Sequence, residues 1–187
     1  MNARKIAVIS IFSSLAAALR IFKHMVFGSF QFINIPLSFV FLTSYFFGGI
    51  TGTLVGFLSF AVSDALLGFG LWTITNSAIS GLLSLPISLL KKVKSKTLLF
   101  VMFYILTFIY DILSSLILYV ILGIPLRTAL AFSVIGLFLP IQGGYMIGVG
   151  PITEFSTALL TILLIYSVER RLASYQMNLS KDFLRER

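Results

Sequence analysis

The dominant pattern of the chain is a series of long apolar runs separated by short charged, glycine-containing or proline-containing segments. A helix needs about 20 residues to cross the hydrocarbon core of a bilayer. Six runs reach or approach that length, over residues 6–22, 33–47, 50–69, 71–90, 97–122 and 151–168. Because these runs are apolar on every side and not along one stripe, the pattern indicates helices in lipid. We therefore predict an all-α membrane protein.

A seventh apolar run, residues 126–141, is shorter and opens with Arg127. Charge decides how to place it, because cytoplasmic loops carry the excess of Lys and Arg. With six spans and an inner N-terminus, eleven of the 14 cations lie inside and only Arg20, Lys23 and Arg127 lie outside. A seventh crossing would leave six cations inside and eight outside. The sequence thus predicts a six-transmembrane-helix bundle with both termini cytoplasmic, in which residues 126–141 form a re-entrant turn or a surface helix.

Composition agrees with this interpretation. The 187 residues are 58% hydrophobic and 11% charged, whereas soluble domains are about half apolar and about a quarter charged. The formal charge of +8 lies in short clusters between the apolar runs, which indicates topology control and not binding of nucleic acid. We expect a multi-pass protein of the plasma membrane, with a transmembrane domain over residues 1–172. Residues 173–187 are then a cytoplasmic tail, either a helix extension or a frayed end.

Polar residues of several predicted helices fall at one depth, in the outer half of the bundle. These candidate ligand-binding residues are Arg20, Asn34, Asp64, Trp72, Asn76, Asp111 and Glu154. Ionisable groups within a membrane are costly and mark functional sites, and a few placed polar groups among aromatic rings are typical of small-molecule sites. Nearby aromatic residues are Phe30, Phe32, Tyr104, Tyr110, Tyr119 and Tyr145. The pattern favours a pocket open to the outside over a proton relay or a water pore, which need polar groups along the whole path.

Several of these residues have a structural alternative. Asp64 is placed to form an ion pair with Arg20 that only joins two helices. Trp72 is a candidate for the aromatic belt at the membrane surface. Asn34 and Asn76 each lie near a predicted helix start, where asparagine commonly caps the helix.

Small residues form two rows on the first predicted helix. Ser10, Ser14 and Ala18 follow one another at four-residue spacing, and Ser13 and Ala17 form a second row beside them. Lipid supplies no hydrophobic force between helices, so close packing depends on small residues that let backbones approach. The first row is a candidate surface for a partner membrane protein, with packing inside the bundle as the alternative.

Motifs for catalysis are missing. The chain has no P-loop, no H-E-x-x-H and no G-x-S-x-G sequence, so ATP binding through a P-loop and the common hydrolase mechanisms have no support. It has no cysteine and one histidine, a poor set of metal ligands. We predict a protein that is not an enzyme and holds no cofactor or metal. The alternatives are a small membrane enzyme acting on a lipid or isoprenoid through Asp64, Asp111 and Glu154, and a structural or assembly factor.

Four segments carry a resemblance to a known family. The segment IAVISIFSSLAAALRIF resembles a first helix with an A-x-x-x-A motif, whose two alanines correspond to Ser10 and Ser14. The segment FINIPLSFVFLTSYFFGGITGTLVGFLSFAVSDALLG resembles a second and third helix with a glycine-rich turn, LWTITNSAISGLLSLPISLLKK a fourth helix, and FLPIQGGYMIG the entry to the last. Together they resemble the S-components of energy-coupling factor (ECF) transporters, which are six-helix vitamin-binding subunits.

The resemblance implies transport without hydrolysis by this chain. An S-component binds a vitamin or its precursor in the outer half, under a lid formed here by residues 23–32 with Gly28 as hinge. It then associates with a membrane coupling subunit and two ATPase subunits of an ABC-type importer, and it topples in the membrane to release its ligand inside. Ser10, Ser14 and Ala18 would contact the coupling subunit.

The resemblance narrows the ligand only in part. Gly81 stands five residues before Pro86, where the thiamine-type pattern has a glutamate, so thiamine is disfavoured. Three acids in the outer half favour a ligand with a positive or hydrogen-bond-donating part. A corrinoid, riboflavin, a deazapurine base and an amino-acid-like precursor remain candidates.

Overall fold

The computed structural model describes residues 2–139, 141–143 and 146–185, with side chains described for residues 2–139 and 149–174. Its helices are α1 (Ala3–Phe27), α2 (Ile35–Phe47), α3 (Gly49–Leu67), α4 (Leu71–Ser84), α5 (Lys96–Ile121), α6 (Leu126–Ile135) and α7 (Gly150–Arg185). Two 3-10 helices, Leu85–Lys92 and Gly136–Phe138, follow α4 and α6. Three short strands form one sheet in the order β1 (Phe30–Gln31), β3 (Met146–Gly148), β2 (Ile141–Gly143).

Five helical segments among the described residues are long and apolar enough to cross a membrane. They are Ala3–Phe27, Gly49–Leu67, Leu71–Lys92, Lys96–Ile121 and Gly150–Ser174. The sixth predicted span is α2, whose 13 residues extend only about 20 Å at 1.5 Å per residue, less than the roughly 30 Å of a hydrocarbon core. The all-α membrane fold is therefore confirmed. The six-span count stays a prediction, because α2, predicted over residues 33–47 as the shortest run, is shorter still in the structure.

The short helix α2 is enclosed by the others. Residues 36–45 are all buried, and the helix contacts α1, α3 and α7. Phe41 stacks on Phe103 of α5 with 5.3 Å between ring centroids. The packing of α3 on α2 requires glycine at position 52, where a Cβ atom would lie 1.7 Å from the Ser44 hydroxyl oxygen. Because longer helices shield it from lipid, α2 does not need the full length of a span.

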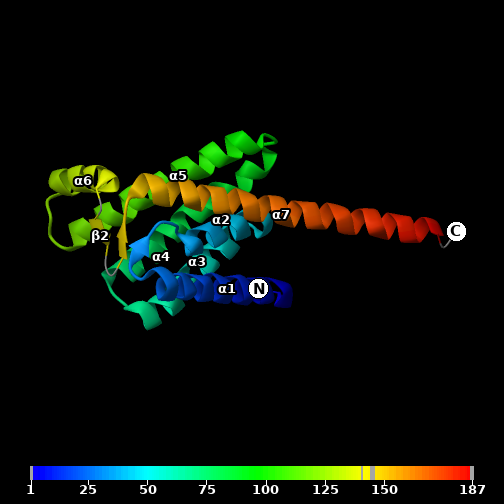
Figure 1. Ribbon diagram of the computed structural model, residues 1–187, viewed down its shortest axis with the longest axis horizontal. Helices are drawn as coiled ribbons and strands as arrows, with labels where there is room; N and C mark the ends of the chain where they lie inside the picture. The colour runs from blue at the N-terminus through cyan, green and yellow to red at the C-terminus, as the bar shows by residue number, and fades with distance from the viewer. Residues whose placement is uncertain (1, 140, 144–145, 186–187) are drawn as a thin grey trace.

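The two ends of the bundle differ in charge. The N-terminus and the Leu85–Lys92 helix lie at one end, and α7 extends beyond it (Figure 1). We call this the basic end, because its helix ends and connections carry Arg4, Lys5, Lys91, Lys92, Lys94, Lys96, Arg170 and Arg171. The opposite end holds α6 and the three strands, and we call it the sheet end. Both termini thus lie toward the same end of the bundle, as the six-span prediction requires.

At the basic end, a polar network joins three helices. Lys96 at the start of α5 forms an ion pair with Glu169 of α7. Tyr45 of α2 donates a hydrogen bond from its hydroxyl to the same carboxylate at 3.3 Å. This network lies at the opposite end of the bundle from the predicted ligand-binding residues, so its substitution is expected not to affect ligand binding.

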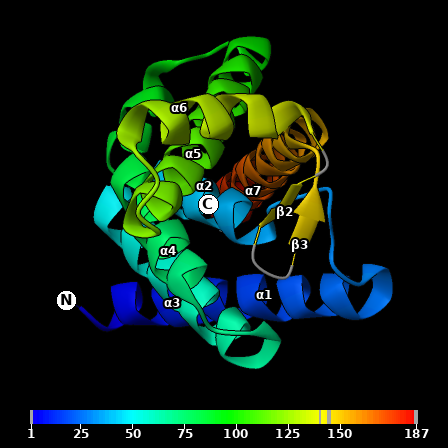
Figure 2. The same cartoon turned by 90° about the vertical axis from the view of Figure 1, so that its left-hand side faces the viewer.

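Helix α1 runs obliquely along one side of the bundle (Figure 2). Its second row of small residues, Ser13 and Ala17, is buried, and α1 makes its largest helix contact with α3. The first row, Ser10, Ser14 and Ala18, is exposed. Close packing within the bundle thus uses the second row, and the alternative of internal packing does not hold for the first row.

The segment that we left open, residues 126–141, contains α6, a 3-10 turn and the start of β2. Helix α6 lies across the sheet end and not between the other helices (Figure 2), so the structure favours a surface helix over a re-entrant turn. At the other end, α7 continues without a break through residue 173 as far as Arg185. The division into a domain of residues 1–172 and a tail of residues 173–187 remains a prediction.

Candidate functional site

Arg20 and Asp64 form a buried ion pair between α1 and α3. The Arg20 Nη1 atom lies 2.8 Å from Asp64 Oδ1, and the two side chains are 8% and 0% exposed. The same Nη1 donates a hydrogen bond to the Ser63 hydroxyl at 2.6 Å, and the guanidinium lies over the Phe60 ring, 5.0 Å from its centroid. The structural alternative for Asp64, an ion pair that joins two helices, is confirmed. These two charges compensate each other inside the bundle.

This assignment predicts a large difference between single and double substitutions. R20M is expected to destabilise the protein by about 3–5 kcal/mol, because it leaves the Asp64 carboxylate buried without its counter-charge. The double variant R20M/D64L is expected to recover most of that loss, because apolar side chains of similar volume often replace a buried ion pair without destabilisation. Thermal unfolding in detergent measures both. Equal destabilisation by the single and the double variant would contradict the assignment.

Asn34 and Tyr110 lie next to this pair. Tyr110 of α5 is buried and stacks on Phe60, with 6.4 Å between ring centroids. Its hydroxyl faces the Asn34 side chain but meets hydrogen-bond geometry with none of the described groups. Asn34 caps α2 by accepting from the Leu37 backbone N–H at 3.2 Å, so the predicted capping role is confirmed. Its own backbone N–H donates to the Thr157 hydroxyl of α7 at 2.8 Å.

Two carboxyl groups meet across α5 and α7. The side chains of Asp111 and Glu154 are close enough to interact directly, and Glu154 is fully buried. Neither carboxyl oxygen of Glu154 meets hydrogen-bond geometry with a described group. A Cβ atom on Gly150 would lie 3.0 Å from Glu154 Oε1 and 2.7 Å from the Leu137 carbonyl oxygen, so the carboxylate lies beneath the connection that follows α6. Buried polar groups nearly always have partners. Asp111 is the polar group that faces Glu154, and the Glu154 oxygens are candidates to contact a ligand.

We use the name polar cluster for six residues: Arg20, Asn34, Asp64, Tyr110, Asp111 and Glu154. Five helices contribute to it: α1, α2 through its cap, α3, α5 and α7. Interactions between neighbouring members connect them: the ion pair from α1 to α3, the approach of Tyr110 to Asn34, and the facing carboxyl groups of α5 and α7. The structure thus brings together five of the seven predicted ligand-binding residues.

Trp72 and Asn76 belong to α4, which is not among the five helices that contribute to the polar cluster. The Trp72 indole N–H donates to the Gly68 carbonyl at 3.2 Å, and its ring covers Gly70, where a Cβ atom would lie 2.5 Å from the ring. Trp72 therefore packs on the turn between α3 and α4. Asn76 is half-buried on α4, whose cap is Gly70, so the alternative of a helix cap at Asn76 is wrong. A ligand-binding role for these two residues stays a prediction.

Lys23 is a buried cation beside Arg20 that sequence reasoning missed, because it was counted as a loop cation. It is only 4% exposed. Its Nζ atom donates to the Gln31 side-chain oxygen and, at 3.4 Å, to the Ile33 carbonyl, and it lies 5.8 Å from the centroid of the Phe32 ring. Its position three residues after Arg20 places both cations on one face of α1, and this spacing could have identified Lys23 from the sequence.

The loop between α1 and α2 leads into the polar cluster through Asn34. Helix α1 continues to Phe27 and α2 begins at Ile35, so this loop spans residues 28–34 and not the predicted 23–32. Its role as a lid stays a prediction. The loop begins at Gly28, whose φ of 61° is a left-handed value that favours glycine. Strand β1 pairs in parallel with β3, and the Thr153 hydroxyl donates to the Gln31 carbonyl at 2.9 Å. These contacts attach the loop to the segment that enters α7.

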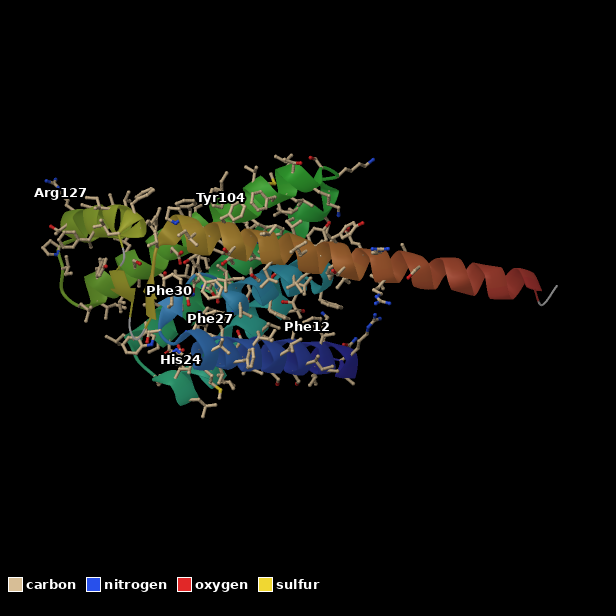
Figure 3. All side chains as sticks on the ribbon, viewed as in Figure 1. Phe12, His24, Phe27, Phe30, Tyr104 and Arg127 are labelled. Atoms are coloured by element: carbon tan, nitrogen blue, oxygen red, sulfur yellow. The ribbon has the colours of Figure 1, made fainter. Side chains whose placement is uncertain are left out.

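Aromatic side chains gather at this loop. Phe32 contacts Phe27 edge-on at 5.0 Å and stacks on Phe30 at 5.9 Å between centroids. Figure 3 places His24, Phe27 and Phe30 together at the sheet end, whereas Tyr104 lies along the opposite side of the bundle. Tyr104 packs against Phe100 and Phe108 of its own helix. Tyr119 contacts Phe132 of α6, and Tyr145 lies outside the described residues.

Fold and site together define a membrane-embedded bundle with a polar cluster at one end and, among the residues described, no group of side chains suited to a metal ion. The sequence matches the family of the ECF-type riboflavin transporter, S component, over residues 1–169, and the chain belongs to this family. No curated protein and no solved structure gives a significant match. Members are substrate-binding subunits of vitamin transporters and not enzymes, so the predicted family is confirmed and the membrane-enzyme alternative is wrong.

Proposed function

We propose that this chain captures riboflavin, or a close flavin relative, from the outer side of the plasma membrane and delivers it through an ECF-type importer. The match to the riboflavin-type family over residues 1–169 carries this proposal. Among the ligands that the sequence left open, it favours riboflavin over a corrinoid, a deazapurine base or an amino-acid-like precursor. The polar cluster and its lid are the proposed binding site.

The chemistry of the site suits a flavin. Riboflavin joins a flat aromatic ring system to a chain that bears several hydroxyl groups. The carboxyl groups of Asp111 and Glu154 can form hydrogen bonds with such hydroxyls. The Tyr110 hydroxyl can donate or accept. The rings of Phe30 and Phe32 on the lid can stack on the flat ring system.

The proposed function also implies an orientation of the protein in the membrane. With the sheet end outside and the basic end inside, the cation-rich connections face the cytoplasm, as the positive-inside rule requires. Both termini then lie in the cytoplasm, and α2 serves as the sixth, shielded span. The lid over the polar cluster faces the outer solution, from which the vitamin arrives.

Association with a coupling subunit and two ATPases completes the proposal. Ser10, Ser14 and Ala18 are exposed on α1, and exposed apolar side chains such as Ile11 and Leu15 lie beside them. A row of small residues on a lipid-facing surface permits close approach of another membrane helix. The chain has no P-loop, so the energy for release must come from the ATPase partners.

Riboflavin binding is the direct test. The protein purified in detergent is expected to quench the fluorescence of added riboflavin until one molecule is bound per chain, because stacking on aromatic rings removes the flavin from water. Thiamine and cobalamin at equal concentration are expected not to displace it. Unchanged flavin fluorescence, or displacement by cobalamin, would overturn riboflavin as the ligand while leaving the family assignment intact.

A further inference from the structure

An apolar groove of about 330 Å³ lies between the Leu85–Lys92 helix and α5, near the basic end. Its lining consists of Pro86, Ile87, Leu90, Met102, Ile105 and Leu106. The volume is at the lower end of the range for small-molecule sites. Ile105 is 51% exposed, so the groove opens on the side of the bundle and not into its core. It is separate from the polar cluster at the sheet end.

Local contacts explain why the groove does not close. Pro86 has no backbone N–H and cannot continue an α-helix, and the chain changes to 3-10 geometry at Leu85. The Ser84 hydroxyl donates to the Gly49 carbonyl at 2.9 Å, and Lys91 Nζ donates to the Phe46 carbonyl at 3.0 Å. Both contacts hold this wall against the turn between α2 and α3. The 3-10 helix is thereby held on the side that faces away from α5.

The lining restricts the occupant to hydrocarbon. All six side chains are apolar, and a polar solute bound there would lose its hydrogen bonds to water without replacement. The residues of α5 that line the groove lie six to ten positions after Lys96, which is about 9–15 Å along the helix. That depth below the charged end of the helix corresponds to the acyl region of a lipid whose headgroup lies at the basic end.

Charge selects the headgroup. Lys92 ends the 3-10 helix that forms the groove wall, Lys94 lies two residues beyond it, and both are exposed. Basic clusters beside membrane helices bind anionic headgroups. We infer that the groove is a binding site for an anionic phospholipid, with one acyl chain between the 3-10 helix and α5 and the phosphate on Lys92 and Lys94. The inference does not depend on riboflavin as the transported ligand.

Native mass spectrometry of the detergent-solubilised protein tests it, by titration with dioleoyl phosphatidylglycerol and dioleoyl phosphatidylcholine. The unmodified chain is expected to bind phosphatidylglycerol more tightly. K92Q/K94Q is expected to weaken phosphatidylglycerol binding about 30-fold, since each lysine near the headgroups contributes about a factor of five. Binding of phosphatidylcholine is expected to stay unchanged. I105W, which fills the groove, is expected to weaken the binding of both lipids.

Two matched controls separate the site from general effects. R4Q/K5Q removes the same charge from exposed positions of α1 at the basic end, and I109W adds the same ring one turn beyond the groove on α5. Both are expected to bind phosphatidylglycerol as the unmodified chain does. Equal affinity for the two lipids, or equal losses in K92Q/K94Q and R4Q/K5Q, would overturn the proposal. If I105W unfolds, the comparison of K92Q/K94Q with R4Q/K5Q still tests the proposal. All four substituted positions are exposed, so these variants are expected to fold.

Discussion

Replacing Glu154 with leucine is expected to lower riboflavin affinity by about 100-fold and to raise the thermal unfolding temperature of the empty protein. The two effects have one cause. The buried carboxyl group has no described hydrogen-bond partner, so it costs stability in the absence of ligand. Its oxygens can form hydrogen bonds with ligand hydroxyls, and each buried partner left unsatisfied costs about 1–3 kcal/mol. The loss of two such bonds, about 2.7 kcal/mol together, corresponds to about 100-fold in affinity. Flavin fluorescence titration and thermal unfolding measure the two quantities.

The control for this experiment is E169Q at the basic end. Glu169 is a carboxylate of the same helix that pairs with Lys96, and its substitution is expected to leave riboflavin binding unchanged. The conservative E154Q variant keeps a hydrogen-bonding side chain and is expected to lose less affinity than E154L. A Glu154 with a purely structural role would give a different pattern, in which E154L lowers stability and leaves affinity unaltered.

Replacing Ser14 with tryptophan is expected to lower cellular riboflavin uptake by more than about tenfold while leaving riboflavin binding to the purified subunit unchanged. Ser14 is exposed on α1, so the larger side chain has room in the isolated chain. In a close helix contact with the coupling subunit the same ring would clash, and overpacking of this kind typically costs about 1–3 kcal/mol. Uptake of labelled riboflavin and binding in detergent separate the two steps.

S167W supplies the matched control, because Ser167 is an exposed serine on α7, away from the row on α1. It is expected to support normal uptake. Co-purification with the coupling subunit gives a second readout, which S14W is expected to lose and S167W to keep. Full uptake by S14W would remove the docking role from this row.

The long helices could be predicted from the sequence because the length and hydropathy of each apolar run indicate a helix without information from the rest of the chain. The candidate site could be predicted where an ionisable residue within an apolar run is informative by itself, as with Asp64, Asp111 and Glu154. Arg20 and Asp64 were also recognised as a possible pair, since opposite charges at one depth attract. In these cases the sequence of a single apolar run is enough to identify the residue as a candidate.

The remainder of the site depends on contacts between distant segments. Asn34 and Thr157 are hydrogen-bonded across 123 positions of sequence, and β1 pairs with β3 although each has only two or three residues. Strands this short leave no alternating pattern to detect. Lys23 was misplaced because a lysine near a helix end normally reaches water, whereas here the lid covers it. Trp72 was included by its depth, which does not specify the direction of a side chain; its ring packs on Gly70, and its role in ligand binding stays a prediction.

The brevity of α2 has a consequence for how a ligand reaches its site. The helix begins at Ile35 under the cap of Asn34, and its roughly 20 Å leaves about 10 Å of the hydrocarbon thickness to the residues of the lid. The loop of residues 28–34 lies over the first turn of α2 and is attached to the start of α7 by the hydrogen bond from Thr153 to the Gln31 carbonyl. If the polar cluster binds riboflavin as proposed, movement of this loop alone would open a path from the outer solution, and the vitamin would not have to pass between helices or through lipid.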